Sequence, residues 1–306
     1  MLTCLDLSFS CIFVYLLCSL ALEALPLRKL VLQGCFDYSY YGIYCLLSKS
    51  PFLQHLDLQD AMFLNDQRIN YLWAFLGDLV SININGCNKL TNAAFFSLLR
   101  NCPLLSEIHM ESTQLGIGSR PSLNLVVYHQ LKSLHLANNS HLQDEDINMF
   151  AFMFPNMQLL DLSSCDDICI VKVSKTCCSI RHLKFAFCPR AKVFLTNVGP
   201  SNLEVLNLSH SRIDDQVLHE ISKIFHRLLQ LDLKHCYHVT EKGLRLALEN
   251  CTHLREINLQ HCRKMSTKIV SWMIFSRPSL RKIKAPPHFR PYDCDRKLLF
   301  GRCLVC

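Results

Sequence analysis

Glycine is scarce in this sequence, with only nine residues in a chain of 306. No glycine-rich loop that could cradle a phosphate is present, and the G-x-S-x-G and H-E-x-x-H signatures of hydrolases and metalloproteases are missing. Without such a constellation the sequence offers no candidate catalytic residues and no cofactor site. It therefore predicts a non-catalytic binding module.

A long hydrophobic segment is missing as well, since no apolar run reaches the roughly 20 residues that a membrane-spanning helix needs. The longest run, CIFVYLLCSLAL at residues 11–22, has the length of a signal-peptide core. The ten residues before it contain Asp6 and no lysine or arginine, whereas a secretory start normally carries a basic segment. We expect an intracellular protein of the cytoplasm or nucleus without a membrane partner. A secreted recognition protein is the less favoured alternative.

Positive charge is also sparse over most of the chain. The net charge is +7, but residues 276–306 alone carry +6, which leaves +1 for all that precedes them. A nearly neutral body is poorly suited to binding polyanions, so no nucleic-acid partner is expected. We interpret residues 289–306 as a basic C-terminal tail.

A repeated leucine pattern dominates what is present. The motif L-x-x-L-x-L, with Ile, Met or Phe as substitutes, recurs every 23 to 26 residues. Its twelve starts lie at positions 2, 27, 53, 79, 105, 131, 157, 180, 203, 228, 254 and 280. Such a period is typical of a leucine-rich repeat, in which each unit is a short strand followed by a helix. The sequence therefore predicts an α/β leucine-rich-repeat solenoid over residues 1–288. This horseshoe would have about twelve strand-helix repeats and a parallel sheet on its concave face.

The eighteen cysteines would suggest disulfides in a short secreted chain, but here many of them follow the repeat. Six stand eight residues after a repeat start: Cys35, Cys87, Cys165, Cys188, Cys236 and Cys262. The chain leaves the strand at this point, where a small side chain fits and a thiol can donate to a turn carbonyl. We expect these six turn cysteines to be buried, reduced and structural.

Zinc binding is the alternative for the histidine- and cysteine-rich segment at residues 234–262. Zinc needs four ligands that converge on one point, whereas Cys236 and Cys262 occupy neighbouring units and Cys251 belongs to the helical side. We therefore predict no metal site in this segment or elsewhere in the chain.

Polar residues suited to the N-terminus of a helix recur twelve residues after the repeat starts. They are Ser39, Asn65, Thr91, Asp215, Thr240 and Ser266. A helix is expected to begin at each of these positions, on the side opposite the strands.

The segment CYHVTEKGLRLALENCTHLREINLQHC at residues 236–262 resembles the cysteine-containing repeat of the F-box/LRR-repeat proteins. The matching residues are Cys236, Val239, Thr240, Glu241, Gly243, Leu244, Ala247, Cys251, Leu254, Ile257, Leu259 and Cys262. A second match is CNKLTNAAFFSLLRNCPLLSEIHM at residues 87–110. The resemblance implies a solenoid that captures a protein substrate for an SCF-type (cullin-RING) ubiquitin ligase, while a separate F-box binds the ligase adaptor.

An F-box would precede the repeats, and the first repeat here already begins at Leu2. The cullin-ligase adaptor is therefore expected as a partner only if an F-box lies upstream. The favoured function is the substrate-recognition part of such a ligase receptor, acting in ubiquitin-dependent protein degradation. A free-standing repeat scaffold unrelated to ubiquitin is the alternative.

Basic residues gather on the strand side of the later repeats, which a solenoid uses for binding. They are His182, Lys184, His210, Lys234, His235, His261, Lys282 and Lys284. Such a cationic wall favours an acidic or phosphorylated protein segment. The three histidines that precede a turn residue in successive repeats are expected to form a row with spacings of ~4.8 Å. This row is a solvated loop edge, a partner contact or, least favoured, a metal triad.

The helix expected in the first repeat is unusual. Residues 11–22 are apolar all round apart from Ser19, although an outer helix normally presents a polar face to water. We expect an exposed apolar patch that makes the chain aggregate, and that polar replacement of Ile12, Val14 and Leu17 would relieve.

The C-terminal residues CLVC resemble a C-a-a-X prenylation box, with Cys303 as the candidate lipid acceptor. Basic residues precede the box at Arg296, Lys297 and Arg302. Together with Cys294 the two cysteines of the box form a C-x8-C-x2-C pattern, for which zinc binding is a disfavoured alternative.

Overall fold

A three-residue strand begins two residues after each of the twelve predicted repeat starts. In the computed structural model the chain divides into two units, Met1–Met157 and Gln158–Cys306. The structure describes residues 2–119, 126–165, 168–170, 173, 176–188, 201–290 and 303–306. The predicted leucine-rich-repeat fold is confirmed.

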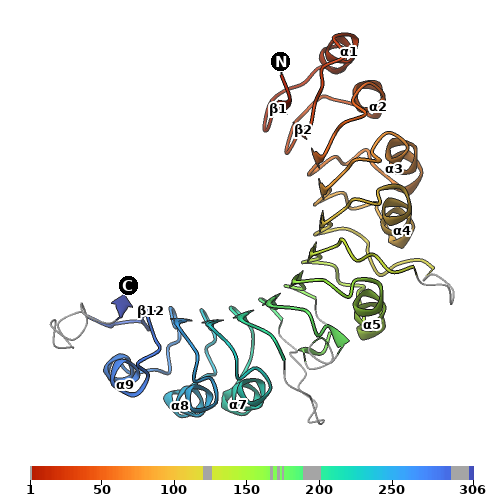
Figure 1. The fold of residues 1–306 in the computed structure, drawn as a ribbon. Helices are drawn as coiled ribbons and strands as arrows, with labels where there is room; N and C mark the ends of the chain where they lie inside the picture. Colours follow the sequence, from red (N-terminus) through yellow and green to blue (C-terminus); the bar gives the residue numbers. More distant parts are fainter. Residues whose placement is uncertain are drawn as a thin grey trace. The chain divides into compact units, whose positions relative to one another are not determined.

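The strands of the first unit form a parallel sheet in sequence order (Figure 1). They are β1 (Cys4–Asp6), β2 (Lys29–Val31), β3 (His55–Asp57), β4 (Ser81–Asn83), β5 (Glu107–His109) and β6 (Ser133–His135). Equivalent residues of successive repeats pair with one another, as Ile108 does with Leu134. Each repeat therefore stacks on the preceding one without a shift of register.

The second unit continues the same pattern. Its described strands are β7 (Leu159–Asp161), β8 (His182–Lys184), β9 (Val205–Asn207), β10 (Gln230–Asp232), β11 (Glu256–Asn258), β12 (Lys282–Lys284) and β13 (Leu304–Val305). All neighbouring pairs among them are parallel. The repeat pattern did not predict β13.

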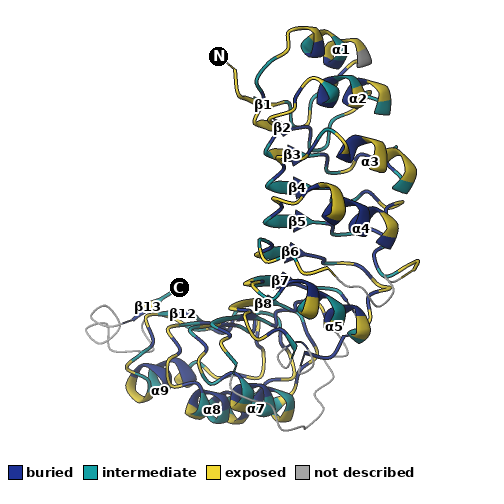
Figure 2. Ribbon diagram, turned by 45° about the vertical axis from the view of Figure 1, so that its right-hand side comes forward, coloured by how far each residue is buried: buried dark blue, intermediate teal, exposed yellow. Residues whose placement is uncertain are grey.

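Helices cover one side of each unit's sheet, and the buried residues lie between the two layers (Figure 2). Those of the first unit are α1 (Val14–Leu22), α2 (Tyr40–Ser48), α3 (Asp66–Trp73), α4 (Asn92–Asn101) and α5 (Asp144–Met153). The helices that the structure describes in full in the second unit are α7 (Asp215–Ile224), α8 (Glu241–Asn250) and α9 (Lys268–Ser276). The middle residue of almost every strand is buried, so the first and last residues face away from the helices.

Every cysteine in the described part of the chain is a free thiol. Five of the six turn cysteines are buried as expected, whereas Cys35 is only half-buried. The thiols of Cys236 and Cys262 donate to the carbonyls of Leu208 and Leu233 in the preceding repeat, at 3.2 and 3.0 Å. Burial raises the pKa of Cys236 to about 12, so this thiol stays protonated at neutral pH.

Polar residues cap the helices, mostly where the sequence predicted them. Three predicted caps accept a hydrogen bond from a backbone N–H of the first helical turn: Asn65, Thr91 and Thr240. Ser39 stands at the N-cap of α2 without such a bond. Two predictions were wrong by one residue, since Asp214 caps α7 and Thr267 precedes α9.

Asp215, which was predicted to cap α7, instead forms hydrogen bonds with the following repeat. Its carboxylate accepts hydrogen bonds from the backbone N–H and the hydroxyl of Thr240, the cap of α8. In the first unit Asp66 holds Thr91 in the same way, at 2.9 and 2.8 Å. A carboxylate at the start of one helix thus orients the capping residue of the following helix.

This contact also explains one glycine of the motif. A Cβ on Gly243 would overlap the Asp215 carboxylate well inside van der Waals contact. Ser266 likewise serves the neighbouring repeat, because its backbone N–H donates to Glu241 Oε1 at 2.8 Å. The positions that were predicted as simple helix caps therefore connect repeats.

The repeat that starts at residue 105 departs from the pattern, since its described residues 110–119 and 126–130 contain no helix. Gly116 and Gly118 have φ values of +102° and +101°, a backbone conformation that no right-handed helix contains. The N–H of Gly116 donates to Asn92 Oδ1 at 2.9 Å, which ties this segment to α4. The spacing of the leucines in the sequence does not reveal that an irregular segment stands where a helix is expected.

The first repeat exposes apolar surface, but not through the residues that the sequence singled out. Ile12 and Leu17 are completely buried, so polar replacement there would disrupt the core. Exposed apolar side chains of this repeat include Phe13, Tyr15 and Leu22, at 65%, 83% and 85%. In the part of the chain that the structure describes, no helix combines the length and apolarity needed to cross a membrane.

The last four residues of the predicted tail take part in the second unit's sheet. Leu304 and Val305 form β13 beside β12, and the N–H of Cys306 donates to the carbonyl of Ile283 at 3.0 Å. Cys303 is buried, so lipid attachment at its thiol would require this strand to leave the sheet. Cys294 and the basic residues before Cys303 lie outside the described residues.

Candidate protein-binding surface

A groove of about 240 Å³ crosses β8 to β12 in the second unit. The last residue of each of these strands lines it: Lys184, Asn207, Asp232, Asn258 and Lys284. Alternate residues of a strand point to opposite sides of the sheet, so these side chains lie opposite the buried leucines. The groove therefore follows from the repeat, which places five residues from equivalent positions of successive units side by side.

The charge of this groove is more balanced than the sequence suggested. Lys184 Nζ lies 3.1 Å from Asp161 Oδ2, so this lysine is already ion-paired within the sheet. Asp232 lies in the groove and accepts a hydrogen bond from Asn258 Nδ2 at 3.0 Å. Lys282 and Lys284 at one end of the groove are its other lysines.

A row of stacked aromatic rings borders the strand ends. His210, His235 and His261 each lie three residues beyond the end of a strand, from β9 to β11. Their ring centroids are 4.2 Å and 4.1 Å apart. Phe187 extends the stack, with its ring 4.1 Å from that of His210. We name these four residues the aromatic row.

All four residues of the aromatic row have left-handed backbone conformations, with φ between +55° and +62°. This conformation costs an ordinary side chain about 1 kcal/mol or more, and glycine, asparagine and aspartate tolerate it best. Equivalent positions of the first unit include Gly34, Asp60 and Asn138. Stacked rings at strained positions are an arrangement that the fold itself does not require.

The outer side of the row carries further polar groups. His235 Nδ1 lies 2.7 Å from the Tyr237 hydroxyl, and the Arg263 guanidinium lies 5.3 Å from the centre of the Tyr237 ring. Partial burial lowers the pKa of His210, and the charge of Lys234 lowers it further. Partial burial together with the neighbouring charges of His210 and His261 lowers the pKa of His235. Both histidines therefore bind a proton less readily than a free imidazole does.

These two shifts predict how the stability of the second unit depends on pH. The histidines bind protons less readily in the folded state than in the unfolded chain. Their contribution to the free energy of unfolding is therefore complete above the unfolded-state pKa of about 6.5. As the pH falls below about 6.5, the unfolded chain takes up protons first and stability decreases until the folded-state pKa values are reached. Amide hydrogen exchange of residues 203–262 should accordingly be faster at about pH 5.5 than at about pH 7.5, beyond the intrinsic pH effect.

The matched variant is His235→Gln, which removes the middle ring. It should show a smaller difference in protection between the two pH values than the parent chain. An unchanged difference would mean that other groups cause the acid sensitivity.

The structure brings together only part of the predicted binding residues. Lys184, Lys282 and Lys284 line the groove, and the three histidines form the row. His182 is exposed at the start of β8 and does not line the groove, while Lys234 lies beside the row. Phe187 was not among the predicted residues, although it precedes Cys188 as His235 precedes Cys236.

The stacked strands, the buried leucines, the turn thiols and the open strand face define a leucine-rich-repeat protein-binding domain. The Leucine Rich repeat family matches residues 250–271. The chain is 25% identical over 236 residues to F-box/LRR-repeat protein 4 of Bos taurus, and the alignment covers 70% of this chain. It spans only 37% of that relative's length. The chain is thus similar to F-box/LRR-repeat proteins, as its repeat motif indicated.

Solved structures with the same fold come from different organisms. A chain of the yeast Rad7 and Elc1 complex has a TM-score of 0.51 at 17% identity, with 95% of this chain and 86% of that chain covered. The internalin InlF of Listeria monocytogenes has a TM-score of 0.54 at 14% identity, with 99% and 86% covered. At these identities the likeness establishes the leucine-rich-repeat fold alone.

Proposed function

We propose that this chain recognises the substrate of an SCF-type, cullin-RING ubiquitin ligase in the cytoplasm or nucleus. The cysteine-containing repeat subtype and the similarity to F-box/LRR-repeat protein 4 support this proposal. The bound protein would then be directed to ubiquitin-dependent degradation. The cullin-ligase adaptor is a partner if an F-box precedes the repeats in the whole protein.

The groove of the second unit favours an acidic or phosphorylated segment of the substrate. Lys282 and Lys284 occupy the two ends of β12 and line the groove together. Lys184 is less suited to this role because Asp161 neutralises it. The aromatic row beside the strand ends offers ring faces to the same segment, and the sheet provides a rigid support.

Charge reversal at β12 tests this placement. The double variant Lys282→Glu and Lys284→Glu should bind the partner about 10-fold more weakly, since two favourable charge contacts become repulsive. Proteins captured from cell extract by the parent chain and the variant are compared by quantitative mass spectrometry. Rising salt should weaken capture by the parent chain, because it screens exposed charges.

The control is Lys29→Glu, a charge reversal at an exposed strand position of the first unit. Selective loss in the β12 variant supports the proposed placement. Equal loss in both variants, or in neither, would mean that the lysines of β12 are solvated surface.

A separate experiment addresses the ligase. The endogenous protein is tagged and purified, and cullin, RING and adaptor subunits are quantified among the proteins that copurify. Deletion of the gene should lengthen the half-life of the captured partner. Capture of a partner without cullin subunits, and without a change of its half-life, would favour the free-standing scaffold.

A further inference from the structure

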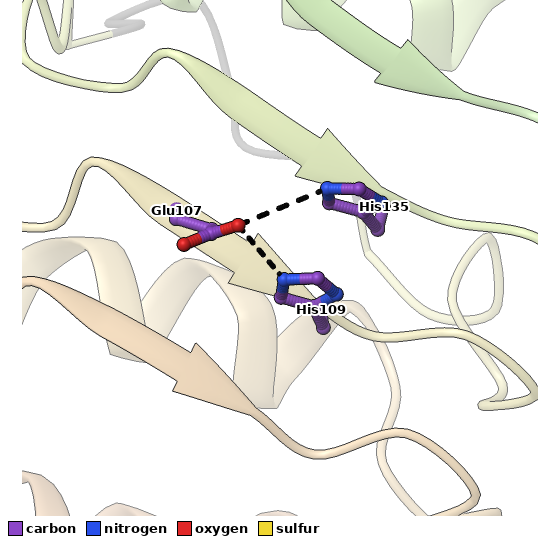
Figure 3. A group of neighbouring side chains, drawn as sticks. All are labelled: Glu107, His109 and His135. Atoms are coloured by element: carbon purple, nitrogen blue, oxygen red, sulfur yellow. Dashed lines mark hydrogen bonds and ion pairs between the residues drawn. The ribbon is translucent and has the colours of Figure 1, made fainter. Parts of the chain in front are cut away.

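Two histidines and a glutamate converge on the open face of the first unit's sheet, far in sequence from the aromatic row. Glu107 and His109 are the first and last residues of β5, so their side chains point to the same side. His135 ends β6 and pairs in register with His109. The fold therefore places three side chains with metal-ligand atoms around one point (Figure 3).

The distances within this cluster are short. His109 Nε2 lies 3.0 Å and His135 Nε2 lies 4.0 Å from the same oxygen, Glu107 Oε1. The two imidazole rings stack with centroids 4.0 Å apart and an angle of 9° between their planes. All three ligand atoms lie within 4.8 Å of one another.

We propose that Glu107, His109 and His135 bind a divalent transition-metal ion of the zinc class. Tetrahedral Zn²⁺ with ligand bonds of about 2.0 Å separates its ligand atoms by about 3.3 Å. The observed separations of 3.0 and 4.0 Å between Glu107 Oε1 and the two histidine nitrogens bracket this value. The imidazole rings are nearly parallel, so one of them must rotate out of the stack before both Nε2 lone pairs point at the ion. The register of β5 and β6 keeps the two histidines side by side.

Polar groups of neighbouring residues lie behind the glutamate and one of the histidines. The hydroxyl of Ser81 on β4 donates to Glu107 Oε2 at 3.2 Å, so the other oxygen is directed at the histidines. Glu111 Oε1 lies 4.0 Å from His135 Nδ1, the ring nitrogen that faces away from the proposed ion. A carboxylate fixes a metal-binding histidine and raises its basicity when it accepts the ring N–H, so Glu111 would have to move closer to take this role.

The ligand set indicates the class of ion. Imidazole nitrogens suit zinc, copper, nickel and iron, whereas magnesium and calcium prefer oxygen ligands alone. The side-chain exposures of His135, His109 and Glu107 are 10%, 26% and 42%, so the cluster is enclosed on one side and open on the other. Three protein ligands leave a coordination position for water on the open side.

Metal titration of the full chain tests the site. The chain is stripped with a chelator, kept reduced with a phosphine, and dialysed against Zn²⁺ and, separately, Co²⁺. We expect one ion to be lost selectively in Glu107→Gln, with at least 10-fold weaker binding at this site, because one of three ligands is removed. His109→Gln should lose the same ion.

Two matched variants control for binding by other histidines. His55→Gln replaces an exposed histidine at the strand position equivalent to Glu107, and His235→Gln interrupts the aromatic row. Both should retain the ion. The Co²⁺ absorption spectrum separates nitrogen and oxygen ligands from thiolates, which add an intense sulfur-to-metal band.

The proposal is overturned if Glu107→Gln and His109→Gln bind as much metal as the parent chain. It is also overturned if the ion is lost in His235→Gln, or if the cobalt spectrum shows that the only bound ion has thiolate ligands. Circular dichroism of each variant establishes that it folds, and Glu107→Gln conserves the shape of a half-buried side chain. Because the cluster lies in the first unit, its failure would leave the proposed function of the second unit untouched.

Discussion

Asn139→Ala should destabilise the first unit by about 3 kcal/mol, because several buried polar groups lose their partner at once. Asn139 is completely buried at the position where other repeats carry a turn cysteine. Its Nδ2 donates to the carbonyls of Met110 and Leu136 at 2.8 and 3.0 Å. Its Oδ1 accepts from the backbone N–H and the hydroxyl of Thr113 at 3.2 and 2.9 Å. Alanine would replace none of these bonds.

Urea denaturation followed by tryptophan fluorescence measures this effect. The two tryptophans lie in different units, so a Trp272→Phe background leaves Trp73 as the reporter of the first unit. Asn139→Cys is the matched control, since the buried thiols of Cys236 and Cys262 show that a cysteine here can donate to a carbonyl. It should cost clearly less than alanine. Equal losses for both variants would contradict the role given to the side-chain amide.

Leu17→Ala should destabilise the first repeat by about 2 to 5 kcal/mol, the usual cost of emptying a leucine site in a packed core. Leu17 is completely buried, whereas its neighbour Leu16 is 43% exposed. Leu16→Ala is therefore the matched control and should have little effect. Limited proteolysis of α1 reports the difference, since the end of a repeat array can open without global unfolding.

The exposed side of α1 should respond in the opposite sense. The double variant Tyr15→Lys and Leu22→Lys removes apolar surface that is 83% and 85% exposed, so it should reduce aggregation without loss of stability. Light scattering at increasing protein concentration measures the change. If the parent chain is already monodisperse, the exposed face of α1 does not drive association.

The strands could be located from sequence because each depends on a leucine that must be buried wherever the repeat recurs. All twelve predicted positions hold a strand for this reason. The helices were less predictable, since Asp215 has a better partner in the next repeat than in its own helix. Among the described residues between β5 and β6, the left-handed backbone of Gly116 and Gly118 replaces the expected helix start. Ile12 and Leu17 could not be separated from Phe13 because an evenly apolar segment does not indicate its buried side.

The candidate sites could be predicted only in part, because they also depend on side-chain conformation and on contacts between strands. The repeat register predicted a row formed by His210, His235 and His261, but stacking was decided by side-chain conformation. His109 and His135 also occupy one register position in successive repeats, a signal as direct as that of the row. Whether the two histidines can form a site depends on Glu107. This residue lies beside both of them because alternate residues of β5 share one side of the sheet and because β5 and β6 pair in register. Ion pairing of Lys184 with Asp161 likewise needs the sheet.

The carboxylate-to-cap contacts give the array a direction. The stability of a repeat protein is the sum of each repeat's own stability and of the interfaces between neighbours. Thr240 at the start of α8 relies on Asp215 of the preceding repeat, whereas α7 is capped by its own Asp214. When a repeat frays, its C-terminal neighbour loses support for its helix start, but its N-terminal neighbour keeps its cap. Local unfolding of one repeat should therefore spread more readily to the repeat on its C-terminal side than to the one on its N-terminal side.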